Sequence, residues 1–171
     1  MSHRPHILVP PDLQIILDQN DAPILLKGTS GTILTGRVFP PEFRQTLYPT
    51  FTERFPEHIP EGTWGITTVS YISAADTFTT GANQLAYGDA FLNESDIFSE
   101  PVGISLATLR AVRGLIEQYQ PINAKELTRR IYRWLVEILE DEQIDTIPLD
   151  LSHTVQHEWD RLVKAASKCR K

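Results

Sequence analysis

Two histidines four residues apart are the clearest candidate metal ligands in this sequence. His153 and His157 stand one helical turn apart, a spacing that lets two imidazoles share one zinc ion. The rest of that zinc motif is missing, because Glu158 follows the second histidine and no third ligand is evident. A rotation of about 100° per residue places both histidines nearly opposite the apolar stripe that carries Trp159. We therefore expect both histidines to face solvent, and we predict no metal site.

Other patterns that resemble catalytic or ligand-binding motifs are incomplete. The segment 27–32 contains two glycines but lacks the Gly-Lys-Ser/Thr ending of a phosphate-binding loop, so we predict a turn between two strands. The acidic residues between Asp89 and Glu100 lack the spacing and the central glycine of an EF-hand. His58 has no evident nucleophile beside it in the sequence. We predict no catalytic residue and no cofactor, and an enzyme with a site scattered over loops is retained as an alternative.

The composition is that of an ordinary globular protein. The chain has 171 residues, of which 41% are hydrophobic and 22% charged, values typical of one folded domain. No apolar run approaches the roughly 20 residues of a membrane span, and the first apolar run is too short for a signal peptide. The single cysteine, Cys169, excludes a disulfide within the chain and suits a reducing compartment. We therefore expect a soluble protein of the cytoplasm.

Charge is distributed unevenly along the chain, whose net charge is −6. Residues 1–100 carry five Lys/Arg against twelve Asp/Glu, while residues 101–171 carry eleven against ten. No Lys or Arg occurs from Phe55 to Leu109. An acidic segment without basic residues repels phosphate, so nucleic acid is not an expected partner of this half. The acidic segment is interpreted as a solvated face, with two alternatives: pairing with the C-terminal arginines, or attraction of a basic protein surface or a cation.

The first hundred residues are predicted to form a small sheet with short helices. Proline pairs suggest that helices begin at Pro10 and at Pro40, since proline suits the first helical turn. Tyr87, Phe91 and Phe98 fall at helical spacing, which predicts a further helix over 83–98. Residue types favour strands in three other segments, namely 24–27, 32–39 and 64–72.

The last seventy residues are predicted to form three helices, at about 105–119, 124–142 and 152–168. The second helix has a strong start signal, with Asn123 as its cap and Glu126 three residues later. The short joint 120–122 makes the first two helices neighbours. The predicted class is therefore α+β, with a small sheet and short helices over 1–100 and a three-helix unit over 104–171. We expect the two parts to pack together as one compact domain.

The second of these helices has an unusually wide apolar arc. Its main stripe contains five residues: Leu127, Ile131, Trp134, Leu135 and Ile138. We expect Trp134 to be buried between the first two helices. A second stripe contains Tyr132, Val136 and Leu139, turned roughly 120–160° from Leu127. This second stripe is either part of the protein's own core or an interface with another copy or another protein.

The leading functional hypothesis is therefore a non-catalytic interaction, adaptor or assembly protein that uses its broad apolar helix faces. The predicted interaction residues are Tyr132, Val136 and Leu139, with Arg129 and Arg133 at the rim. No small-molecule ligand and no membrane partner is predicted.

A weaker pattern suggests a DNA-binding regulator as an alternative. The stretch 120–130 resembles the turn and second helix of winged helix-turn-helix domains, which implies a degenerate motif over 109–135. The resemblance implies that Arg129, Arg130 and Arg133 contact DNA. The pattern departs from that family after Arg130, because the apolar positions continue the same helix with no Gly, Pro or Asn. The isoelectric point of about 5.3 also opposes DNA binding.

Overall fold

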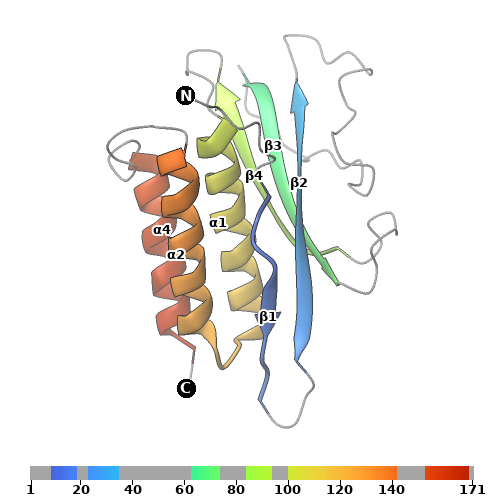
Figure 1. Ribbon diagram of the computed structural model, residues 1–171, viewed down its shortest axis with the longest axis vertical. Coiled ribbons are helices and arrows are strands. Elements are labelled where there is room, and N and C mark those ends of the chain that lie inside the picture. Colours follow the sequence, from blue (N-terminus) through green and yellow to red (C-terminus); the bar gives the residue numbers. More distant parts are fainter. Residues whose placement is uncertain are drawn as a thin grey trace.

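The computed structural model describes residues 9–18, 23–34, 63–73, 84–93, 100–141 and 153–169. These residues form a curled, four-stranded antiparallel sheet followed by three helices (Figure 1), so the predicted α+β class is confirmed. The strands lie side by side in sequence order: β1 (Leu13–Ile15), β2 (Ile24–Leu34), β3 (Thr63–Ser73) and β4 (Gln84–Asn93). The helices are α1 (Glu100–Tyr119), α2 (Ala124–Asp141) and α4 (His153–Ser167).

Helix α1 is the central element of the fold. It packs against β3 and β4 on one side and against α2 and α4 on the other, as Figure 1 shows. Nine of its residues are at most 2% exposed: Ile104, Ser105, Ala107, Thr108, Leu109, Ala111, Val112, Leu115 and Ile116. These residues are therefore covered by other elements of the same chain. None of the helices in the described residues combines the length and the apolar character that crossing a membrane requires.

Helix α1 approaches β4 closely because both elements present small side chains. A Cβ atom placed on Gly88 would lie 2.6 Å from the backbone nitrogen of Ala111 and would collide with the carbonyl oxygen of Ala107. Ala86 and Ala90 lie two residues to either side of Gly88 and so point to the same face of the strand. The predicted helix over 83–98 is therefore wrong for residues 84–93. The large residues Tyr87 and Phe91 lie on the opposite face of β4. Residues four apart share a face in a strand as well as in a helix, so their spacing fits both structures.

Strand β1 stands where the sequence suggested a helix beginning at Pro10, and that prediction is wrong. Leu13 and Ile15 are buried while Gln14 is exposed, which is the alternation of a strand. Leu13 pairs with Leu26 of β2 in antiparallel register. Tertiary pairing thus overrides the helix-start signal of the two prolines. The helix predicted from Pro40 lies outside the described residues.

The joint between α1 and α2 protects the outer edge of β1. The side-chain Nδ2 of Asn123 donates to the carbonyl of Gln14 at 2.8 Å, and its Oδ1 accepts from the nitrogen of Ile16 at 3.1 Å. The nitrogen of Ile122 donates to the carbonyl of Ile16 at 2.8 Å. Asn123 stands directly before α2, as predicted, and its amide replaces a neighbouring strand. An edge whose polar groups are paired in this way is closed to further strands.

Strand β2 runs unbroken through the glycines of 28–31, so the predicted turn is wrong, while 24–27 and 32–34 are strand as predicted and 35–39 lie outside the described residues. Gly28 is required for close packing, since a Cβ there would lie 2.9 Å from Pro10 Cβ and 2.9 Å from Tyr71 Cε1. The ring of Tyr71 is completely buried, and its hydroxyl donates to the carbonyl of Pro11 at 2.9 Å. The strand predicted over 64–72 is confirmed as most of β3.

The three predicted C-terminal helices are confirmed, and α1 begins five residues earlier than expected. Trp134 differs from its prediction, because it is half-buried rather than buried. Its indole Nε1 donates to the carbonyl of Val9 at 3.0 Å, which fixes the described start of the chain against α2. The N–H donor of the indole explains this position, because it needs an acceptor and the carbonyl of Val9 supplies one.

Candidate functional site

Helices α2 and α4 carry an apolar surface that is open to solvent. We call it the outer ridge and define it by four residues: Tyr132, Val136, Trp159 and Val163. Tyr132 is 42% exposed and Val163 is 40% exposed, while Val136 and Trp159 are half-buried. Val136 follows Tyr132 by one helical turn, and Val163 follows Trp159 by one turn, so each pair shares a helix face. The opposite side of α2, with Leu127, Ile131, Leu135 and Ile138, is buried in the core.

An aromatic contact joins the two helices within the outer ridge. The ring centroids of Tyr132 and Trp159 lie 5.3 Å apart, with the ring planes tilted by 52°. Such a pair contributes about 0.5–1.5 kcal/mol beyond its buried area. The contact fixes the orientation of Tyr132 while nearly half of its surface stays in water. A rigid, partly exposed aromatic side chain is typical of the anchor residues of protein interfaces.

The structure brings four of the five predicted interaction residues onto one face of α2. Arg129 and Arg133 are exposed beside Tyr132, and Val136 is half-buried. Leu139 lies within α2, but its side chain is outside the described residues. Trp159 and Val163, the α4 residues of the ridge, were not predicted from the sequence, because Trp159 falls on the apolar stripe that was expected to be buried. Val163 could have indicated this surface, because it is an apolar residue that stands beside the stripe rather than on it.

The charges of α2 run opposite to its helix dipole. The first ten residues, Ala124 to Arg133, hold four cations and one acid, whereas the last eight hold three acids and no cation. Helix dipoles favour acids near the N-terminus and cations near the C-terminus. Glu126 is the one residue that follows this rule. The other charges of α2 oppose the helix dipole and do not stabilise the isolated helix, so their order needs another explanation.

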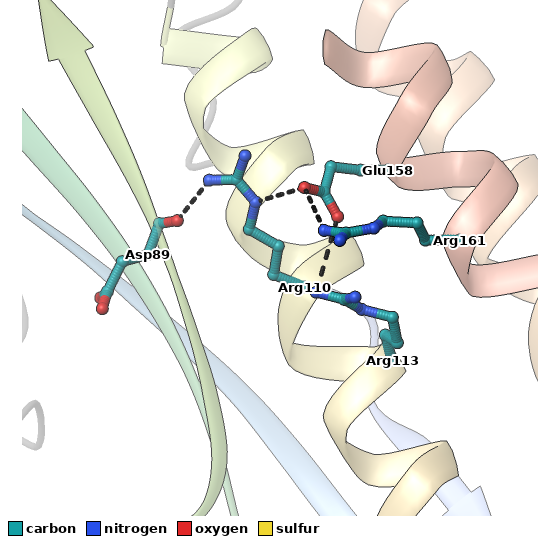
Figure 2. A network of polar contacts seen from close by, with 5 residues as sticks. All are labelled: Asp89, Arg110, Arg113, Glu158 and Arg161. Atoms are coloured by element: carbon teal, nitrogen blue, oxygen red, sulfur yellow. Dashed lines mark hydrogen bonds and ion pairs between the residues drawn. The ribbon is translucent and has the colours of Figure 1, made fainter. Parts of the chain in front are cut away.

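A buried acid holds α4 against α1 on the other side of the helical layer. The side chain of Glu158 is 5% exposed, and its Oε2 accepts a hydrogen bond from Nε of Arg110 at 2.9 Å. Arg161 lies 3.7 Å from the same oxygen, and Arg113 lies 3.8 Å from Oε1 (Figure 2). Arg110 also donates from Nη1 to the carbonyl of Asp89 in β4, at 2.6 Å. One arginine thus connects the sheet, α1 and α4.

We interpret the Glu158 cluster as structural. Its carboxylate lies between Arg110 and Arg113 of α1 and Arg161 of α4, and these contacts hold α4 against α1. The ion pair of Glu158 could not be predicted from the residues near it, because its partner Arg110 stands 48 residues earlier in the chain.

The histidine pair is exposed, as predicted. In the part of the chain that the structure describes, no group of three or more His, Cys, Asp or Glu side chains is placed to hold a metal ion.

Comparison with known proteins gives no relative: no protein-family model, curated protein or solved structure matches this chain. What the protein does is therefore inferred from the outer ridge and from the charges beside it.

Proposed function

We propose that the protein is an assembly protein that associates with a second copy of itself through the outer ridge of α2 and α4. The observation that carries this proposal is the reversed charge order of α2, with cations in its first part and acids in its second. Two such helices attract each other when they lie antiparallel, because the basic part of each faces the acidic part of the other.

Twofold symmetry makes this pairing specific. In an antiparallel twofold contact, a residue that stands a given number of positions before the axis meets the residue of the partner copy that stands the same number of positions after it. An axis near Arg133 places Arg129 opposite Glu137, since both stand four positions from it. Arg129, Arg133 and Glu137 are exposed in the described chain and free to meet a partner surface. The two copies of Arg133 stand level with the axis but about 100° around α2 from Tyr132, so their guanidinium groups can point to the side and stay in water.

The apolar residues of the ridge would then form the centre of the contact. Rotation of about 100° per residue places Lys125, Arg129 and Val136 within about 60° of Tyr132, so basic and apolar groups share one face, while the exposed Glu137 lies about 140° from Tyr132, at the edge of the outer side of α2. Interfaces commonly combine an aromatic and aliphatic centre with a charged rim. The role is structural and non-catalytic, and we place it in the cytoplasm, where a lone cysteine stays reduced.

A charge-swap series tests the proposal. Arg129→Glu and Glu137→Arg each place like charges together across the axis, so each variant should weaken self-association by about tenfold or more. The double variant Arg129→Glu/Glu137→Arg restores opposite charges and should recover the dimer. Lys168→Glu, directly after α4 and away from the ridge, is the control for charge change alone. Sedimentation velocity supplies the dissociation constants, and a double variant as weak as the single variants would refute antiparallel pairing of α2.

A further inference from the structure

A second feature of the helical layer lies on another face of α4, between the C-terminal halves of α1 and α4. These two helices border an open cavity of about 300 Å³. Six of the lining residues carry a charge or a thiol: Arg113 and Glu117 of α1, Arg161 and Lys164 of α4, and Lys168 and Cys169 directly after α4. A volume of this size is at the lower end of the range for small-molecule sites.

The cavity is strongly basic in an acidic protein. Four cations and a single acid line it, whereas the whole chain carries a net charge of −6. Lys164 lies in the last turn of α4, where a cation complements the helix dipole. That explanation does not extend to Arg113, which lies in the second half of α1 but before its last turn. The concentration of positive charge therefore exceeds what helix ends require.

The hydrogen-bonding capacity of these cations is largely unused. Arg113 and Arg161 approach Glu158 only at 3.8 Å and 3.7 Å, beyond hydrogen-bonding distance. Glu158 receives its short hydrogen bond from Arg110 instead. Within the described residues, no carboxylate lies within ion-pair distance of Lys164 or Lys168. Two guanidinium groups and two ammonium groups thus border one cavity with donors to spare.

The chemistry of the cavity fits an oxyanion. Guanidinium groups bind phosphate through paired N–H donors, and ammonium groups add compact positive charge. Burial raises the pKa of the Cys169 thiol, so this wall presents a neutral group rather than a competing thiolate. We propose that the cavity between α1 and α4 binds a small phosphate-bearing anion through Arg113, Arg161, Lys164 and Lys168.

Titration calorimetry with inorganic pyrophosphate tests this site on the full chain. The Lys164→Gln/Lys168→Gln variant removes two exposed charges and should fold normally, because exposed substitutions change stability little. It should bind pyrophosphate at least about tenfold more weakly than the unmodified protein, since each lost charge-assisted hydrogen bond weakens binding by about that factor. The control variant Arg130→Gln removes an exposed charge from α2, outside both the cavity and the charge pairs of the proposed dimer, and should bind as the unmodified protein does.

Two ligand controls decide the class of anion. Sodium chloride at equal ionic strength should give no saturable heat, and succinate, a dicarboxylate, should bind more weakly than pyrophosphate. Equal binding of succinate would overturn the phosphate assignment. No saturable pyrophosphate binding, or equal loss in Lys164→Gln/Lys168→Gln and in Arg130→Gln, would overturn the site itself. The outer ridge takes no part in this experiment, so self-association and anion binding fail or succeed independently.

Discussion

Nε of Arg110 lies 2.9 Å from Oε2 of Glu158, which joins the central helix α1 to α4 through a buried carboxylate. The same arginine holds the carbonyl of Asp89 in β4. The two ends of the guanidinium therefore tie the helical layer to the sheet, and the position of α4 depends on this side chain.

Arg110→Ala should destabilise the protein by roughly 1.5–3 kcal/mol, because the buried Glu158 loses its short charge-assisted hydrogen bond while Arg113 and Arg161 remain at 3.8 Å and 3.7 Å. Urea unfolding followed by circular dichroism measures this loss. Asp160→Asn, at an exposed position two residues after Glu158, is the control and should change the free energy of unfolding by less than about 0.5 kcal/mol. Near-native stability of Arg110→Ala would show that the Glu158 cluster is not what holds α4 in place.

Two glycines give a matched pair of substitutions with opposite signs. Gly88→Ala should destabilise by about 1–3 kcal/mol, since the added Cβ meets the backbone of α1, which cannot yield as a side chain can. Gly114→Ala should stabilise by about 0.5–1 kcal/mol, because nothing lies within 4 Å of the new methyl group and alanine favours the helix. Thermal unfolding of both variants checks the prediction. A stabilised Gly88→Ala would contradict the close packing of α1 on β4.

Tyr71 should make the protein less stable in alkaline solution. Complete burial, followed by the charge of Asp12, raises the pKa of Tyr71 far above its ordinary value of 10.0. Above pH 10 the unfolded chain therefore loses a proton that the folded chain keeps, so stability falls as pH rises. Tyr71→Phe removes this contribution and also the bond to Pro11, which costs about 1 kcal/mol at neutral pH. Urea unfolding at pH 8 and pH 10.5 should show a smaller alkaline loss in Tyr71→Phe. Equal losses would mean that Tyr71 ionises in the folded state.

The double variant His153→Ala/His157→Ala should unfold at the same temperature as the unmodified protein, to within a degree or two, because both side chains are exposed. The measurement is repeated with a metal chelator. A large drop that appears only with the chelator, and only in the unmodified protein, would reveal a metal site at this pair.

The helical part was predictable because its signals are local. Asn123, Glu126 and the apolar positions of α2 specify a helix within one stretch of sequence. The sheet was harder to predict, because β4 alternates small and large residues rather than apolar and polar ones. In the sequence, Gly88 indicates a break in a helix and Gly28 indicates a turn. Their role in the structure is close packing against α1 and Tyr71, which come from distant parts of the chain.

The candidate site was predictable in part for the same reason. Tyr132, Val136, Arg129 and Arg133 share one helix face, which spacing alone identifies. Trp159 and Val163 join that face only because α4 packs beside α2, and the sequence does not say which helices are neighbours. Glu158 needs a partner from a distant helix, so nothing near it in the sequence announces its role.

The solution mass of the purified protein tests self-association through the outer ridge most directly. Light scattering after gel filtration should give about twice the chain mass of 19.4 kDa, and Tyr132→Glu/Val163→Glu should give the single-chain mass with an unchanged circular dichroism spectrum. A single-chain mass for the unmodified protein at every concentration, or a dimer that survives both glutamates, would contradict assembly through this surface.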